Sequence, residues 1–312
     1  MAVSANDASI QSSKPRRLFA LPDRRSRVGY AFIAPALLIV VVVSLYPIAF
    51  GIWLSFTDWY LLQSLTPTFA GLAGYRRLLG DADFWQSLGR SGVWTIGTVA
   101  LEYVIAMPVA LLLNRRSRIT SFLTGALLLP WVTPTIVVAY TWRWLFDSQF
   151  GTVHYLLQRV GLAGERSLLA DPKTALWALI LVSAWKGAPF MAVALLATMK
   201  SIPGDLYEAA AVDGATRRRQ FLDITLPLLR QVSVVMGLVL GILAFYSFDL
   251  VWVITKGGPS DATQILGVYL FRLFFERLEL SYAATIGVAM LALLIVFSAV
   301  YLRVASRQDN DA

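Results

Sequence analysis

Six long apolar stretches constrain this chain more than any other feature of its sequence. Each contains about 20 or more mostly apolar residues, the length at which an α-helix crosses the hydrocarbon core of a bilayer. The stretches are residues 29–56, 89–113, 120–145, 173–198, 232–254 and 283–304. Only 15% of the residues are charged, whereas soluble domains contain about 25%. We therefore predict an all-α, polytopic membrane protein with six transmembrane helices.

The distribution of lysine and arginine predicts which loops face the cytoplasm. If both termini are inside, cytoplasmic segments hold 16 of the 27 basic residues, and the outer loops 57–88, 146–172 and 255–282 hold seven. Cytoplasmic loops of membrane proteins are enriched in lysine and arginine, so both termini are expected in the cytoplasm. The same bias accounts for the net charge of +8 without a nucleic acid partner. The first apolar stretch is too long for the core of a signal peptide, and we expect it to be retained as an anchor.

The residue inventory excludes several kinds of chemistry. The chain has no cysteine and one histidine, His154, which excludes thiolate sites, histidine-cluster metal sites and a cysteine nucleophile. We expect His154 to be a solvated loop residue, since no G-x-S-x-G motif accompanies it. The sequence also lacks the G-x-x-x-x-G-K-[ST] loop that cradles phosphates. Catalysis by this chain is therefore not expected, and energy for uphill transport must come from another protein.

A polar segment at 199–230 separates the fourth and fifth apolar stretches and contains its own helix signals. Ser201 and Asp205 are candidates for capping the start of a helix. Gly214 is suited to ending it, because glycine readily adopts the left-handed conformation that follows a helix. One face of this helix carries mostly small residues at i, i+3, i+4, i+7 spacing, namely Leu206, Ala209, Ala210 and Asp213. A helix of about nine residues is marginal by itself, so other contacts must hold it.

A second short helix is expected directly after this turn. Thr216 can cap it, and Pro227 is tolerated at the start of the following span. The three arginines at 217–219 suit attraction to anionic lipid at the inner leaflet. The whole segment is thus either a connector on the membrane surface or a docking site for a cytoplasmic protein.

The segment resembles the EAA loop of importer permeases of the ATP-binding-cassette (ABC) superfamily. The matching residues are Glu208, Ala209, Ala210, Asp213, Gly214, Ala215, Phe221, Ile224, Leu226 and Pro227. A second stretch resembles an outer loop of the carbohydrate branch of that family, through Thr255, Gly257, Gly258, Pro259 and Thr263. The stretches WKGAPFMAVALLATMKSIPGDLYEAA and FAGLAGYRRLL also fit, although Ala73-Gly74-Tyr75 replaces the more usual Gly/Ala-Asn-Tyr. The resemblance covers nearly the whole chain.

The resemblance implies a fold and a domain organisation. It suggests the fold of type I ABC importer permeases, multi-pass in a bacterial or archaeal inner membrane. The organisation would be a basic cytoplasmic tail (1–28), a permease domain (29–304) that includes the coupling loop (199–230), and a cytoplasmic C-terminal tail (305–312).

The resemblance also implies a function and partners. Such permeases form half of a heterodimeric pore with a second homologous permease. A dimer of cytoplasmic ATPases, which bind ATP and Mg, contacts the EAA helices, and an extracytoplasmic solute-binding protein delivers the substrate. This chain would need no cofactor of its own. The residues expected to couple to the ATPases are Glu208, Ala209, Ala210, Asp213, Gly214 and Ala215.

The substrate class expected from the resemblance is a sugar or oligosaccharide. Glycerol 3-phosphate, an amino acid or another polar solute is the alternative within the superfamily. An ion-coupled secondary transporter is a further alternative, but the repeated halves common in that class are not seen. A membrane enzyme is disfavoured by the missing catalytic clusters.

Ionisable residues within apolar spans are energetically costly and suggest function. A candidate solute pathway combines two such residues with two aromatic ones that suit sugar faces: Lys186, Asp249, Trp185 and Tyr246. Structural pairing between helices is the alternative role for Lys186 and Asp249. We expect a structural role for Glu102, and we expect Arg143 to extend toward the membrane interface. Gly237 and Gly241 form a GxxxG motif, which favours close packing on a helix of this chain or of a companion permease.

Overall fold

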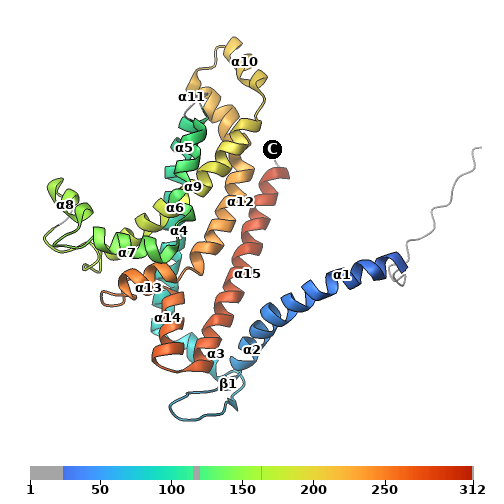
Figure 1. Ribbon diagram of the computed structural model, residues 1–312, viewed down its shortest axis with the longest axis vertical. Helices are drawn as coiled ribbons and strands as arrows, with labels where there is room; N and C mark the ends of the chain where they lie inside the picture. The colour runs from blue at the N-terminus through green and yellow to red at the C-terminus, as the bar shows by residue number, and fades with distance from the viewer. Residues whose placement is uncertain (1–23, 115–119, 163, 311–312) are drawn as a thin grey trace, which may run out of the picture. The chain divides into compact units, whose positions relative to one another are not determined.

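The computed structural model describes residues 24–114, 120–162 and 164–310 (Figure 1). The chain divides into two compact units, 1–50 and 51–312, each considered by itself below. The described part of the first unit contains α1 (Arg24–Val40), a π-helical turn η1 (Val41–Leu45) and the start of α2 (Tyr46–Leu54). Large apolar side chains between 32 and 50 are exposed, as expected of a surface that faces lipid or another subunit. The predicted basic tail lies mostly outside the described residues.

The second unit is built almost entirely from helices, with one short antiparallel hairpin near its beginning. Thr57 pairs with Phe69 and Asp58 with Thr68 in that hairpin. The elements after α2 are β1 (Thr57–Asp58), β2 (Thr68–Phe69), α3 (Ala73–Gly80), α4 (Ala82–Leu113), α5 (Thr120–Leu127), α6 (Leu129–Val132), α7 (Thr135–Leu145), α8 (Thr152–Arg159), α9 (Ala175–Ser201), α10 (Gly204–Val212), α11 (Arg217–Gln220), η2 (Phe221–Thr225), α12 (Leu226–Phe245), α13 (Asp249–Thr255), α14 (Leu266–Phe271), η3 (Arg272–Glu276) and α15 (Leu280–Asn310). The predicted all-α fold is confirmed.

The described residues contain five helical segments long and apolar enough to cross a membrane, or six if one bent pair counts as a single span. The third predicted span, 120–145, is that pair, because the chain bends by 88° between 132 and 135. The prediction of one continuous helix there is wrong. Pro134 has no N–H to continue a helix and disfavours helical geometry in the residue before it. Thr133 is accordingly extended, with φ −63° and ψ 131°.

The fifth predicted span also differs in its ends. A continuous helical segment runs from Arg217 through η2 to Phe245, so the second short helix of the cytoplasmic segment is not separate from the span. Pro227 lies in the first turn of α12, as expected. The helix stops after Phe245, and α13 begins at Asp249, whereas one helix was predicted over 232–254.

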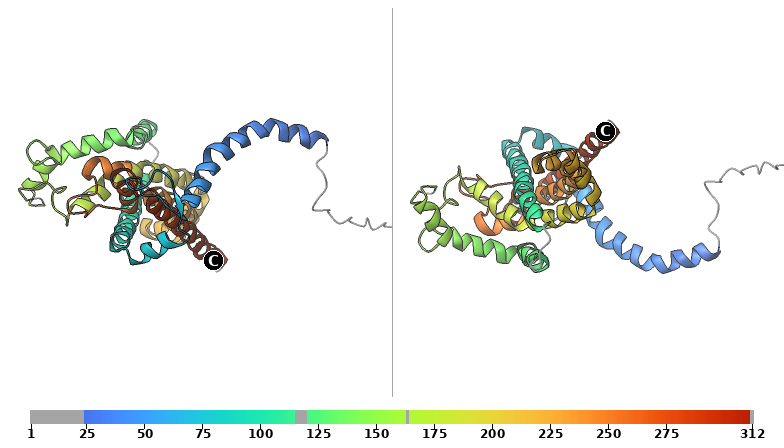
Figure 2. Two further views of the ribbon diagram at one scale, coloured as in Figure 1. Left: turned by 90° about the horizontal axis from the view of Figure 1, so that it is seen from below. Right: turned by 90° about the horizontal axis from the view of Figure 1, so that it is seen from above.

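The core of the second unit lies along α4 and α9, the helix pair with the most extensive mutual contact, and α12 packs against both. Figure 2 shows the same bundle of helices from its two ends. The buried indole N–H of Trp94 on α4 donates to the carbonyl of Ala244 on α12 (3.0 Å). The GxxxG motif faces α15: a Cβ atom on Gly237 would lie 2.7 Å from the Tyr301 hydroxyl, and one on Gly241 would touch Phe297. The packing partner of the motif is therefore within this chain.

His154 corrects one expectation about the loops. It lies on α8 and is 1% exposed, and neither ring nitrogen has a hydrogen-bond partner among the described residues. The prediction of a solvated loop histidine is wrong. The segment 152–159 forms an amphipathic helix, whose Val153 and Leu157 pack against the apolar cluster around the buried Phe146.

Candidate functional site

The first candidate site is α10, which carries the EAA residues. It lies at one end of the second unit, between the end of α9 and the start of α11 (Figure 1). None of its nine residues is buried, and Val212 is 88% exposed. Glu208 and Ala209 are exposed, and Ala210 is partly exposed. A short helix without buried residues gains little stability from its own chain, so its outer surface is open to a partner.

The turn after α10 is tightly defined by backbone hydrogen bonds. Gly214 has φ +79°, the left-handed conformation predicted for it. The Ala215 N–H donates to the Ala210 carbonyl (2.8 Å) and the Gly214 N–H to the Ala211 carbonyl (3.1 Å). This 6→1 and 5→2 pair of bonds is the Schellman motif that closes many helices. Asp213, Gly214 and Ala215 thus fix the direction in which the chain leaves α10.

Two further hydrogen bonds stabilise the segment from α10 to η2. The hydroxyl groups of Tyr207 and Thr225 are 2.9 Å apart and share a hydrogen bond. Thr216 caps α11 by accepting from the Arg219 N–H (3.4 Å), as predicted. The predicted N-terminal caps of α10 are wrong, because Pro203 occupies the cap position and Ser201 still belongs to α9, where its hydroxyl donates to the Thr198 carbonyl.

The second candidate site surrounds Trp185 and Lys186 on α9. The Lys186 ammonium donates to the carbonyl of Trp131 (3.2 Å) on α6. The end of α6 leaves carbonyl groups without helical partners, and Trp131 lies in that last turn. Its ring stacks on Phe190 at a centroid distance of 4.9 Å. Trp185 meets Trp142 of α7 edge to face, with centroids 5.4 Å apart.

This arrangement combines one cation with four aromatic rings next to the bend between α6 and α7. Sequence reasoning did not connect Trp131 and Phe190 with Lys186. The signals were present, since Lys186 and Phe190 are four residues apart on one helix and Pro134 follows Trp131 closely. Irregular backbone inside a membrane is tolerated where protein covers it or where it lines a water-filled cavity. The bend therefore suits a polar pathway.

Tyr246 and Asp249 form a second group, at the interruption between α12 and α13. Both side chains are exposed, and Asp249 is the first residue of α13. In the part of the chain that the structure describes, no ion pair joins Asp249 to Lys186. The two groups are linked indirectly, because α13 packs against α7. Arg143 on α7 donates to the Val253 carbonyl across that contact (3.4 Å).

Glu102 on α4 is 5% exposed and lies against Gly187 of α9. One of its carboxylate oxygens, Oε2, has no partner among the described residues. A buried polar atom without a hydrogen bond costs free energy. Glu102 thus lies in the α4–α9 contact, beside the residue that follows Lys186, and its structural role stays a prediction.

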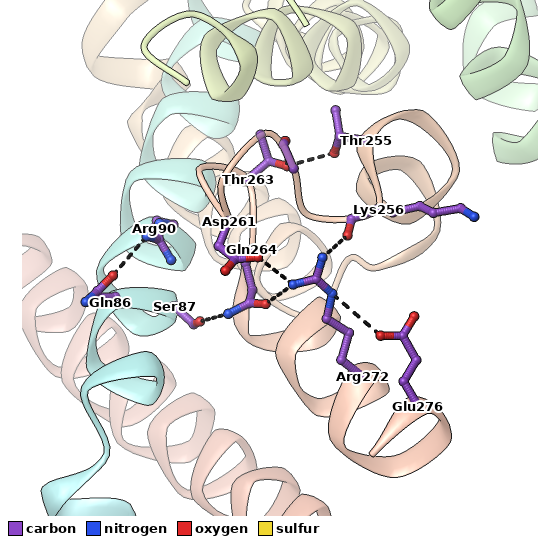
Figure 3. A network of polar contacts seen from close by, with 11 residues as sticks. Gln86, Ser87, Arg90, Thr255, Lys256, Asp261, Thr263, Gln264, Arg272 and Glu276 are labelled. Atoms are coloured by element: carbon purple, nitrogen blue, oxygen red, sulfur yellow. Dashed lines mark hydrogen bonds and ion pairs between the residues drawn. The ribbon is translucent and has the colours of Figure 1, made fainter. Parts of the chain in front are cut away.

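The segment after α13, predicted as an outer loop, contains α14 and η3 and is organised around Arg272 (Figure 3). The Arg272 guanidinium donates to Asp261 (2.5 Å), to Gln264 and to the Lys256 carbonyl (2.7 Å). The Thr263 hydroxyl donates to the Gly258 carbonyl (2.7 Å). These hydrogen bonds hold the Gly-Gly-Pro loop in one conformation. The Lys256 side chain points away from the network (Figure 3).

Comparison with known proteins gives the class of this chain. Residues 102–310 match the family described as "Binding-protein-dependent transport system inner membrane component". The match covers more than half of the chain, and it includes α10 and both groups of solute-site residues. The chain belongs to this family of transport permeases.

Individual relatives support the same class over almost the full length. The chain is 33% identical to the trehalose/maltose transport system permease protein MalF of Thermococcus litoralis, over 91% of this chain and 95% of that protein. It is also 33% identical to the sulfoquinovosyl glycerol transport system permease protein SmoG of Agrobacterium fabrum, over 89% and 90% of the two chains. Its fold is similar to a chain in the crystal structure of a bacterial ABC transporter that imports alginate, with a TM-score of 0.77, 21% identity, and coverage of 91% and 96%.

Proposed function

We propose that this chain is half of the pore of an ATP-driven importer for a sugar or oligosaccharide. The other half would be a second homologous permease. The observation that carries the proposal is α10, an exposed helix with the EAA residues and a rigid Schellman turn at one end of the membrane bundle. Because no residue of α10 is buried, the helix contributes little to the packing of the described part of its own chain. Its exposed surface is free to contact another protein. The family membership and the carbohydrate names of the relatives support the same reading.

The energy source would be a dimer of cytoplasmic ATPases that bind ATP and Mg. Glu208 would make charge-assisted hydrogen bonds to them, which are stronger than neutral ones. Ala209 and Ala210 allow a close approach. An extracytoplasmic binding protein would deliver the solute to the opposite end. The described residues contain no group of three or more His, Cys, Asp or Glu side chains that could hold a metal ion.

The solute would pass the Lys186 group and the break that carries Tyr246 and Asp249. Aromatic rings can cover the apolar faces of a sugar ring, while the Lys186 ammonium and the Asp249 carboxylate can bind its hydroxyl groups. Uptake of glycerol 3-phosphate or an amino acid remains the alternative within the same superfamily. Sugar-stimulated ATP hydrolysis by the reconstituted complex distinguishes these substrates.

The coupling role is tested with Glu208→Ala and Gly214→Val. A side chain at φ +79° strains the turn by about 1–3 kcal/mol, and Glu208→Ala removes a charged contact. Both variants should reach the membrane, while co-purification of the ATPase and solute uptake fall. The extracytoplasmic binding protein should keep its affinity for sugar.

Matched controls exist for both changes. Glu165→Ala removes an exposed carboxylate far from α10, and Gly161→Val introduces a side chain at a similar left-handed position, φ +74°. Both controls should keep uptake and ATPase binding. Normal uptake in Glu208→Ala and Gly214→Val would remove the coupling role. Lost uptake with intact ATPase binding would show that α10 transmits motion without providing affinity.

A further inference from the structure

The β1–β2 hairpin, α3 and the start of α15 meet at the end of the second unit opposite α10 (Figure 1). A polar cavity lies among the residues of these segments. Its volume is about 360 Å³, within the range of roughly 300–1,000 Å³ that is typical of small-molecule sites. The residues that line it come from three distant parts of the sequence: Asp58, Trp59, Tyr60, Gln63, Arg77, Glu279 and Tyr282. None of them belongs to either candidate site described above.

The backbone around this cavity is firmly held. The Leu61 N–H donates to the Leu278 carbonyl (3.1 Å), and the Leu280 N–H donates to the Trp59 carbonyl (3.0 Å). These bonds clamp the chain after β1 to the first turn of α15. The cavity is therefore part of a fixed framework and does not depend on a flexible loop.

The floor of the cavity is fixed by charged and aromatic groups. Arg77 forms an ion pair with Glu279, and its guanidinium carbon lies 3.8 Å from the centre of the Tyr282 ring. The hydroxyl groups of Tyr282 and Tyr269 both donate to Asp81. Burial raises the pKa of Asp81, but the hydrogen bonds from these tyrosines outweigh it and hold the pKa below its ordinary value. The charged groups of the floor, Arg77, Glu279 and Asp81, thus already have partners within the chain.

Three other lining groups have no such partner. In the described ranges, no side chain or backbone group bonds the Asp58 carboxylate, the Gln63 amide or the Tyr60 hydroxyl. The indole N–H of Trp59 is taken by the Ser64 carbonyl (3.1 Å), which leaves its ring surface for contact. The cavity therefore offers one carboxylate, one amide, one hydroxyl and an aromatic surface to a ligand.

We propose that this cavity binds one end of a neutral saccharide at the outer mouth of the pore. The proposal rests on the proposed function, since it concerns the same solute. A carboxylate and an amide bind adjacent hydroxyl groups, and an indole ring covers the apolar face of a sugar. Arg77 and Glu279 compensate each other and Asp58 adds one negative charge, which disfavours an anionic ligand.

The test uses the absence of native cysteine in the chain. Gln63→Cys places a thiol in the cavity and removes the Gln63 amide, while Asp58, Tyr60 and Trp59 remain to bind the sugar. Gln149→Cys, an exposed loop position, serves as the control. The full transporter in vesicles is labelled with a water-soluble thiol reagent, with and without maltose or trehalose, and uptake of the same sugars is measured. Occupancy should slow labelling of Gln63→Cys by a factor of about 1 + [L]/Kd, or roughly tenfold at ten times the Kd. The control should not change.

Adding Asp58→Ala to the Gln63→Cys variant should shift protection to higher sugar concentration, while adding Glu165→Ala should not. Protection without this shift overturns the site. Uptake without protection overturns the saccharide site and leaves the importer function standing. Protection from labelling without sugar uptake supports the saccharide site and overturns the importer function. If neither protection nor uptake is found, the saccharide site and the importer function are both overturned. Protection by the sugar-free binding protein, with none by sugar alone, would make the cavity a receptor contact and overturn the proposal.

Discussion

Replacing Gly187 with alanine tests the contact between α4 and α9 directly. A Cβ atom at this position would overlap the Glu102 carboxylate, with the carboxyl carbon only 2.7 Å away. Glu102 is 5% exposed, so its carboxylate has to shift within the buried α4–α9 contact to make room. Overpacking of this kind costs about 1–3 kcal/mol, while alanine gains about 1 kcal/mol over glycine in helix propensity. The net change in the free energy of unfolding should be a loss of about 0–2 kcal/mol.

The same substitution should change sign when Glu102 is replaced by alanine. The overlap is then removed, and only the helix propensity gain of about 1 kcal/mol remains. The coupling between the two positions is therefore about 1–3 kcal/mol, the size expected of residues in contact. In domains of 150–250 residues, each kcal/mol shifts the melting temperature by about 2–4 °C.

The assay is the apparent melting temperature of the purified transporter, measured for the four members of this double-mutant cycle. Gly89→Ala is the matched control, because Gly89 lies inside α4 as Gly187 lies inside α9, and no atom lies within 4 Å of its added Cβ. It should be slightly stabilising in both backgrounds. An identical shift from Gly187→Ala with and without Glu102 would refute the reasoning.

Three further predictions follow from other parts of the molecule. An impermeant thiol reagent applied to intact cells should label Gln158→Cys but not Gln220→Cys; the reverse result overturns the predicted topology. Lys186→Met should lower uptake at least tenfold in assembled complexes, a change of about 1.4 kcal/mol, because it removes the ammonium beside the Trp131 carbonyl; normal uptake would exclude Lys186 from the pathway. The lowered pKa of Asp81 contributes stability above the ordinary carboxyl range, about pH 4, and this contribution is lost as pH falls through the lowered pKa. Melting temperatures measured against pH should therefore fall less steeply in acid for Asp81→Asn than for the wild type; parallel curves would contradict this.

Local signals predicted much of the fold. Gly214 and Thr216 take the predicted backbone and capping roles because these depend only on neighbouring residues. The apolar runs predicted α4, α9 and α15 because span length is set by the bilayer. The 88° bend was missed although Pro134 is in the sequence, since apolar length alone does not tell a straight helix from a broken one.

The solute site was predicted only in part. Trp185 and Lys186 stood out as polar or aromatic groups within a span, but Trp131 joins them only after α6 packs on α9. The burial of His154 has the same origin, because it depends on the cluster against which α8 packs. Tertiary pairing of this kind leaves no local trace in a single sequence.

The continuous helix from Arg217 to Phe245 has a mechanical consequence. Its 29 residues correspond to a rod about 43 Å long at about 1.5 Å per residue. One end adjoins the rigid turn after α10, and the other ends at the interruption before Asp249. A tilt of about 5° at the α10 end would displace the far end by about 4 Å over that length. A small rotation of this helix at the α10 end would thus move the backbone beside Asp249 by a distance comparable to the size of a side chain.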